Sequence, residues 1–141
     1  MKDNAVFVFG SNTGGIHGAG AAKEAYKNHG ARWGSGYGHV GSSFAVPTKG
    51  HEFDYLNRPF VGKTLDLKTI EEFITGFVAY ARTHPELDFR VTCLGCGLAG
   101  LRHDEVAPIF NKLRADQMPN VYFDTLWTEH LSINAKFWGT F

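Results

Sequence analysis

Residues 6–22 read VFVFGSNTGGIHGAGAA and pass from an apolar strand through five glycines into a helical stretch. Residues 89–101 read FRVTCLGCGLAGL and follow the same order. Glycine permits positive φ angles and lets a ligand approach the bare backbone. The first amides of a helix have no partner within that helix and carry partial positive charge. Two such turns in one small chain predict a cleft for a ligand with two charged groups, such as a diphosphate.

The length of the chain predicts one domain with one core. The chain has 141 residues, and within this single 1–141 domain residues 127–141 are expected to pack on the body as a C-terminal tail. The formal net charge is zero. This balance argues against non-specific nucleic-acid binding and leaves only a local basic patch open.

Several features predict a cytoplasmic protein without a membrane partner. No stretch approaches the roughly 20 apolar residues of a membrane span. Residues 1–4 lead directly into a strand, so we expect no signal peptide. Cys93 and Cys96 lie three residues apart and cannot build a disulfide framework, which suits a reducing compartment.

Strands and helices are expected to alternate along the chain. The apolar runs predict strands, and Pro47 is expected to end the second of them and to precede an irregular, polar segment over 50–64. Alternating strands and helices imply a three-layer α/β/α fold with a mostly parallel sheet and helices on both faces. Ligands of such sheets bind at the carboxyl ends of strands, where both glycine turns fall. The expected strands are 5–9, 43–46, 89–94 and 121–126.

Apolar periodicity and capping residues predict three helices, over 19–28, 70–81 and 104–113. His29-Gly30 is a plausible end for the first. The second is expected to be capped either by Thr69 with Glu72 or by Asp66. Asp104 is the expected cap of the third.

The first glycine loop does not fit the common nucleotide-binding patterns. Residues 15–20 do not match the dinucleotide fingerprint, and Gly20 is followed by alanines rather than by the lysine of a phosphate-binding P-loop. A tight strand-to-helix turn without any ligand is the alternative. A ligand site is favoured because one turn rarely needs five glycines.

Other candidate residues have plain structural explanations beside functional ones. Cys93 and Cys96 could form a redox or zinc pair, but a structural zinc site needs four ligands and the chain has no second CxxC, so we expect no metal and no cofactor. Lys49 could be a solvated loop lysine. His17 and His103 flank the glycine loops, where a lone histidine is more often structural.

Aromatic residues crowd the end of the chain. A tail packed on the body is the favoured explanation, and a platform for a protein partner is the alternative. The cluster consists of Trp127, Phe137, Trp138 and Phe141.

Three motifs together resemble the macrodomain, an ADP-ribose-binding α/β/α fold. Residues 17–22 (HGAGAA) resemble the turn that opens the first ligand helix in the branch containing terminal ADP-ribose glycohydrolase. Residues 43–49 (SFAVPTK) resemble that branch's strand ending in Thr-Lys, and residues 94–101 (LGCGLAGL) resemble its phosphate loop. The resemblance covers roughly residues 5–126 and is to a short type known from bacteria and phages.

The resemblance implies that backbone amides of the two loops hold the diphosphate and the distal ribose. Ser11 and Asn12 match the strand end that lines this ribose, and Asp124 with Leu126 would lie on the adenine side. The implied loop residues are His17, Gly18, Ala19, Gly20, Gly95, Cys96, Gly97, Leu98, Ala99 and Gly100.

The resemblance also implies a lysine that attacks the anomeric carbon and an acidic residue that resolves the adduct. Lys49 matches the lysine, whereas the acidic position is here Ala99. Asp104 is a candidate substitute for the missing carboxylate. The more common macrodomain type has Asp in the first ligand loop, where this chain has Ala19.

Three functions follow as hypotheses. The favoured one is a module that binds and sequesters ADP-ribose, an ADP-ribose-derived nucleotide or an ADP-ribosylated macromolecule. The second is a hydrolase that removes ADP-ribose from a carboxylate or nucleobase through Lys49. The third is a protein adaptor that uses the aromatic tail. The missing carboxylate favours binding, and the retained lysine favours chemistry.

Overall fold

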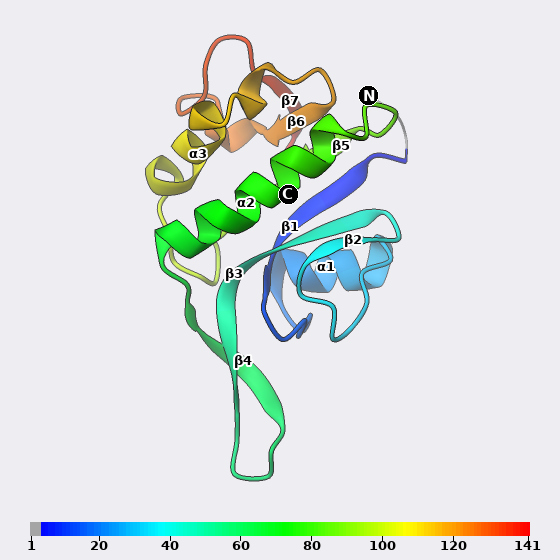
Figure 1. Cartoon of the computed structure of the whole chain (residues 1–141), viewed down its shortest axis with the longest axis vertical. Coiled ribbons are helices and arrows are strands. Elements are labelled where there is room, and N and C mark those ends of the chain that lie inside the picture. Colours follow the sequence, from blue (N-terminus) through cyan, green and yellow to red (C-terminus); the bar gives the residue numbers. More distant parts are fainter. Residues whose placement is uncertain (1–3) are drawn as a thin grey trace.

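Across residues 4–141, the part of the chain that the computed structural model describes, seven strands form one mostly parallel sheet (Figure 1). The order is β2-β3-β1-β5-β6-β7, with β4 paired to β3 as a hairpin. The pairs β1–β3, β1–β5, β5–β6 and β6–β7 are parallel, and β2 and β4 run antiparallel to β3. The strands are β1 (Val6–Asn12), β2 (Gly38–Val40), β3 (Ser43–Phe53), β4 (Pro59–Thr64), β5 (Phe89–Val91), β6 (Val121–Asp124) and β7 (Lys136–Gly139).

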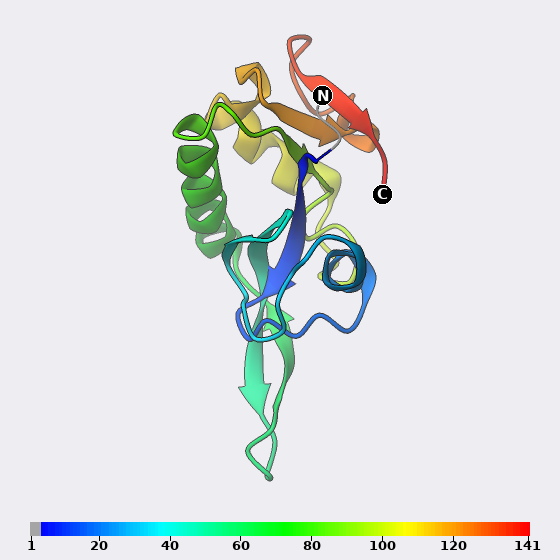
Figure 2. The same ribbon diagram turned by 90° about the vertical axis from the view of Figure 1, so that its right-hand side faces the viewer.

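Helices cover both faces of this sheet, as Figure 2 shows with α1 on one side and α2 on the other. The helices are α1 (Gly20–Asn28), α2 (Leu67–Arg82) and α3 (His103–Lys112), with short 3-10 turns at Ala115–Gln117 and Thr125–Trp127. The predicted three-layer α/β/α architecture is therefore confirmed.

Strand β1 divides the core between the two faces because successive side chains of a strand point in opposite directions. Val6 and Val8 join the larger core under α2 and α3, whereas Phe7 and Phe9 join the smaller core under α1. Ala22 and Ala25 of α1 are small and buried, so this helix packs closely on β1. The close packing places the first turn of α1 near the end of β1.

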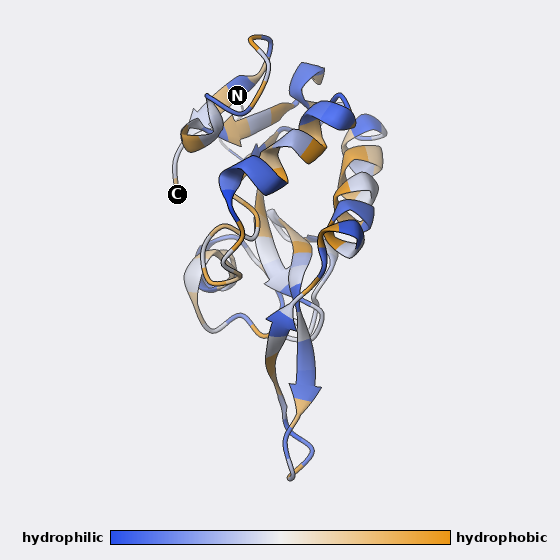
Figure 3. Ribbon diagram, turned by 90° about the vertical axis from the view of Figure 1, so that its left-hand side faces the viewer, coloured by the Kyte–Doolittle hydropathy of each residue, from blue (hydrophilic) through white to orange (hydrophobic). Residues whose placement is uncertain are grey.

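Helix α2 confirms the predicted amphipathic pattern. Its buried residues are Ile70, Ile74, Phe77, Val78 and Ala81. Hydrophobic and hydrophilic positions alternate along the helix (Figure 3). Of the two predicted caps, the structure has Asp66, whose carboxylate accepts a hydrogen bond of 2.8 Å from the Thr69 amide.

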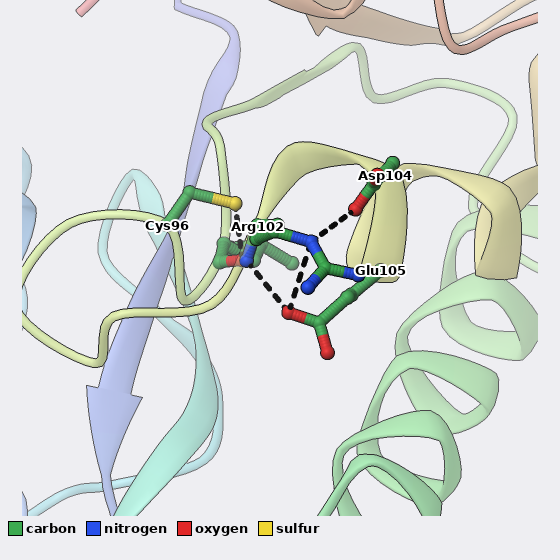
Figure 4. A network of polar contacts seen from close by, with 5 residues as sticks. Cys96, Arg102, Asp104 and Glu105 are labelled. Carbon is green, nitrogen blue, oxygen red and sulfur yellow. Dashed lines mark hydrogen bonds and ion pairs between the residues drawn. The ribbon is translucent and has the colours of Figure 1, made fainter.

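The predicted cap of α3 was wrong by two residues. The N-cap is Arg102, and the Glu105 carboxylate accepts the Arg102 N–H at 2.9 Å. Asp104 lies within the first turn and instead pairs with the Arg102 guanidinium at 2.9 Å (Figure 4). A carboxylate at the third helical position can bond back to the cap, which explains why the helix begins before Asp104.

The prediction that Pro47 ends a strand was also wrong, because β3 continues to Phe53. Phe7 N–H donates to Ser42 C=O, so the even-numbered residues of β3 donate toward β1 and the Pro47 nitrogen lies on the opposite side. Strand β2 pairs with β3 only over Ser43–Ala45. Proline therefore costs no ladder bond here.

The expected irregular segment 50–64 is instead a hairpin arm that projects from the body (Figure 1). At its tip the Asp54 carboxylate accepts the amides of Leu56 and Arg58, both at 2.9 Å, and pairs with the Arg58 guanidinium. Exposed apolar residues such as Phe53, Phe60 and Val61 are mixed with polar ones here, and the strand pattern is hidden because the arm has solvent on both faces and nothing buries alternate residues.

The last residues of the chain add an edge strand that was not predicted. β7 pairs in parallel with β6, and Trp127 in the preceding turn is fully buried. The Trp138 indole N–H donates to the Val91 carbonyl at 3.0 Å. Most of the aromatic cluster of the tail is thus packed on the sheet. The helices within residues 4–141 include none that is both long and apolar enough to cross a bilayer.

Candidate functional site

A cavity of about 540 Å³ lies at the carboxyl ends of the central strands. One wall comes from the end of β1 and the start of α1, and the other from the loop that follows β5. β3 contributes Thr48 and Lys49, and the end of β6 contributes Asp124. This is the edge at which parallel α/β sheets bind ligands.

Almost all of the predicted site residues line this one cavity. The exceptions are His17 and Gly100. Those that line it are Ser11, Asn12, Gly18, Ala19, Gly20, Lys49, Gly95, Cys96, Gly97, Leu98, Ala99, Asp124 and Leu126.

The first wall presents the unpaired amides of a helix N-terminus. The first hydrogen bond inside α1 runs from Lys23 N–H to Ala19 C=O at 3.2 Å. Within the described chain the amides of Gly20, Ala21 and Ala22 therefore have no helical acceptor, and all three residues line the cavity. Gly20 has φ +58°, a conformation that glycine adopts without strain. Such an end attracts anions.

The second wall is a compact loop that closes on itself. Leu101 N–H donates to Gly95 C=O at 2.9 Å, and Gly100 N–H donates to Gly97 C=O at 3.0 Å. These bonds leave the amides of Gly97, Leu98 and Ala99 without a backbone acceptor in the residues described. Gly95 has φ +75°, a conformation that favours glycine, and a β-carbon there would also lie 2.8 Å from Leu101 Cδ1 and displace that side chain.

The two walls meet at a glycine. A β-carbon at Gly20 would lie 3.5 Å from Leu98 Cδ1, so the Leu98 side chain rests over the start of α1. Leu98 is 69% exposed, which leaves its outer face open to a ligand. The exposed Leu98 side chain and both sets of residues with unpaired amides thus line the same cavity.

Ser11 and Asn12 line the cavity, but their polar atoms hold the first loop in shape. The Asn12 side chain accepts from Ile16 N–H and donates to Ile16 C=O, both at 2.9 Å. The Ser11 hydroxyl donates to the Gly36 carbonyl. Their polar groups are therefore engaged by the protein's own backbone.

His17 is a structural residue. Its side chain is 1% exposed, and Nε2 lies 2.9 Å from the Arg32 carbonyl oxygen. The ring packs edge-on against Phe9 and Trp33. Gly100 lies in the second loop, where its backbone adopts a φ angle of +76°. Neither residue reaches the cavity.

Several cavity residues were not predicted. Thr48 sits directly beside Lys49, and Thr92 and Cys93 follow the end of β5 just before the predicted loop, so their positions were a usable signal. Val61 comes from the hairpin and Phe141 from the tail, so only the tertiary fold reveals them. The remaining unpredicted lining residues are Gly10, Ile16, Ala21, Ala22 and His103, whose Nδ1 accepts the Trp127 indole N–H at 2.9 Å.

Lys49 supplies positive charge to the cavity. It is half-buried in β3, opposite Asn12 and Thr64, and has no ion-pair partner in the described part of the chain. A cation in this position can pair with a phosphate.

Asp124 is the carboxylate among the cavity-lining residues, and it is 2% exposed. Its oxygens accept the Leu126 amide at 2.9 Å and the Thr140 hydroxyl and Phe141 amide at 3.1 Å each. These bonds anchor the tail.

Asp104, the candidate substitute for a resolving carboxylate, is exposed on α3, paired with Arg102, and does not line the cavity.

The two cysteines are protonated at neutral pH. Burial raises the pKa of the Cys93 thiol to about 12, and the nearby charge of Asp124 adds to the effect. Burial, with the charge of Glu105, raises the pKa of the Cys96 thiol to about 11. Metal ligation and nucleophilic attack require the thiolate. In residues 4–141 no group of three or more His, Cys, Asp or Glu side chains is placed to hold a metal.

We expect the protein to fold and to bind its ligand without zinc. Two protonated thiols with no further ligand cannot form a tetrahedral site. Elemental analysis of protein purified without a chelator should give far less than one zinc per chain. Dialysis against a chelator should leave the thermal unfolding temperature unchanged. A stoichiometric zinc that survives dialysis would contradict this expectation.

Comparisons with known proteins support the fold alone. No family model matches the chain, and no curated protein matches it. A solved structure of a protein of unknown function from Bacteroides thetaiotaomicron is similar, with a TM-score of 0.55 and 13% sequence identity. The match covers 84% of this chain and 88% of the other.

Proposed function

We propose that this protein binds ADP-ribose or a closely related nucleotide derivative, as a module that sequesters or recognises it. One observation carries the proposal: two sets of backbone amides without a backbone acceptor belong to residues that line a single cavity, one set at the start of α1 and the other in the loop after β5. Two such sets suit the two phosphates of a diphosphate, because each set donates hydrogen bonds to anionic oxygens.

The other features of the cavity support the same ligand class. Its volume of about 540 Å³ falls within the range of small-molecule sites. Leu98, Leu126 and Phe141 provide apolar surface for a nucleoside. Lys49 adds a cation for a phosphate. The cavity thus combines the groups that a nucleoside diphosphate sugar needs.

An ADP-ribosyl hydrolase is the second candidate, and Lys49 is the observation that favours it. A cavity lysine without an ion pair can act as a nucleophile once it loses its proton. The same cavity offers no unengaged carboxylate within the described residues, because Asp124 is occupied by the tail. Binding is therefore the better supported function. The adaptor hypothesis gains little, since Trp127 is fully buried and Trp138 is packed against β5.

Calorimetric titration with ADP-ribose, AMP and cyclic ADP-ribose tests the proposal. ADP-ribose should bind at least about tenfold more tightly than AMP, because AMP can satisfy the amides of only one wall and a charged hydrogen bond contributes about 1.5–3 kcal/mol. The affinity for cyclic ADP-ribose, compared with that for ADP-ribose, shows whether the cavity has room for a ribose that is fixed in a ring. Absence of binding heat with all three compounds would overturn the proposal.

A further inference from the structure

His103 is a cavity residue that belongs to neither glycine loop. It is the first residue of α3, and its half-buried ring lines the cavity. Two residues that do not line the cavity hold this ring. The Trp127 indole N–H donates to Nδ1 at 2.9 Å, and the His130 ring stacks on it with 6.2 Å between ring centres. The orientation of His103 is therefore set from behind the cavity wall.

Trp127 is a rigid donor that decides which nitrogen of His103 carries the proton. It is fully buried, and its ring packs against Phe110 and Phe123 with 5.5 and 6.3 Å between ring centres. An indole N–H can only donate, so Nδ1 of His103 must accept through its lone pair. An imidazole that accepts at one nitrogen carries its N–H at the other. The contact with Trp127 thus fixes the tautomer of His103 with the proton on Nε2.

The Nε2 atom of His103 is open. Residues 4–141 form no hydrogen bond to it. In the same part of the chain, the buried side-chain polar atoms that lack a partner are His17 Nδ1 and Asp116 Oδ1. Nε2 of His103 is therefore neither bonded nor buried. Because the ring lines the cavity, this N–H is available to a ligand there.

His103 lies at the end of the cavity that is opposite to Lys49. Lys49 is in β3, whereas Trp127, which holds His103, follows β6. The strand order β3-β1-β5-β6 separates these two ends by three strand spacings, or about 14 Å. Leu126 and Phe141 line the β6 end and give it apolar surface. An apolar surface with one directed polar group suits a nucleobase, and the amides between the two ends suit the phosphates.

We propose that His103 is a ligand-binding residue whose Nε2–H donates a hydrogen bond to an acceptor atom of the bound nucleobase. This role rests on the nucleotide-binding function proposed for the cavity, and it gives that function a residue that contacts the base. Ring nitrogens of adenine accept such bonds. A donor that is held in place before the ligand arrives loses little freedom on binding. Trp127 therefore supports ligand binding without touching the ligand.

The tautomer is measured by long-range proton–nitrogen NMR on the whole chain labelled with nitrogen-15. The chain has seven histidines, and the signals of His103 are those that disappear in His103→Asn. In the free protein, His103 should carry its proton on Nε2. ADP-ribose and AMP should each shift this N–H signal, because both contain adenine. A proton on Nδ1, or a signal that ADP-ribose leaves unmoved, overturns the proposal.

Two variants separate contact with the ligand from support of the fold. Asn can place an oxygen near the position of Nδ1, and Gln can place an N–H near the position of Nε2. His103→Asn should keep the unfolding temperature but bind ADP-ribose and AMP about three- to tenfold more weakly. His103→Gln should keep most of the affinity but lower the unfolding temperature by at least about 3 °C, because the buried Trp127 N–H loses its acceptor.

His84→Asn is the control, since His84 follows the end of α2 and does not line the cavity. It should leave both affinities unchanged. An equal loss for ADP-ribose and AMP in His103→Asn supports a contact with the adenine that they share. A loss confined to ADP-ribose, or no loss with either ligand, overturns the proposal.

Failure of this role and failure of the nucleotide-binding function give different results. If ADP-ribose binds and His103→Asn binds it equally well, the nucleotide-binding function stands and His103 has no part in it. If calorimetry detects no binding of ADP-ribose or AMP to the unmodified protein, both proposals fall.

Discussion

Gly97→Glu is expected to abolish ADP-ribose binding and to leave the fold intact. A β-carbon at Gly97 meets no atom within 4 Å, and the residue does not have a positive φ angle. The new side chain therefore fits without strain and extends beside the free amides of the second wall. Its carboxylate would occupy the place of a phosphate and repel it. We expect affinity to fall by more than about 100-fold, that is by more than about 2.7 kcal/mol, measured by calorimetry.

Gly97→Gln is the matched control, because it adds nearly the same volume without the charge. It should bind ADP-ribose more tightly than Gly97→Glu. Circular dichroism and the unfolding temperature of both variants should match those of the unmodified protein. If the folded Gly97→Glu variant binds ADP-ribose with unchanged affinity, the phosphates do not lie at this wall.

Lys49→Ala should weaken ADP-ribose binding by about 1.5–3 kcal/mol, which corresponds to roughly 10–150-fold. The expected loss is that of one charged hydrogen bond to a phosphate. The backbone of Lys49 stays in the β3 ladder opposite Asn12 and Thr64, so the variant should fold normally. Lys49→Arg should retain part of the affinity, and Lys63→Ala on the exposed hairpin should retain all of it.

The same variant separates binding from catalysis. If the protein is a binding module, the unmodified chain should release no ADP-ribose from a glutamate-modified protein or a modified nucleobase. A hydrolase that used Lys49 as nucleophile would show turnover that Lys49→Ala loses by orders of magnitude while affinity is retained. Borohydride would then trap an adduct on Lys49 in the unmodified protein. That result would mean that the protein is a hydrolase and not only a binding module.

The position of the cavity was predictable because it depends on local signals. Gly20 and Gly95 mark turns that only glycine makes easily, and each lies in a glycine-rich loop that comes after an apolar strand. Because β1 and β5 are parallel neighbours, their carboxyl ends lie at the same edge of the sheet. Lys49 and Asp124 could be placed by the same rule.

The side chains' actual partners were not predictable in the same way. His17 stands next to Gly18 in the first glycine loop, yet its side chain turns inward to the Arg32 carbonyl because the loop over 30–36 folds back over it. Phe141 and Val61 reach the cavity through the tail and the hairpin arm, whose positions depend on distant contacts. Both faces of that arm are exposed and mix polar with apolar residues, so the alternation that usually reveals a strand is missing.

The central place of β1 has a consequence for how the chain is made in the cell. β1 leaves the ribosome before β5, and its Val6–Val8 segment pairs with Phe89–Val91, more than 80 residues later. At about 5–20 residues per second, the apolar strand waits roughly 4–16 s for this neighbour. Exposed strand edges of that kind invite aggregation. We therefore expect nascent chains to need chaperone protection until β5 has been synthesised.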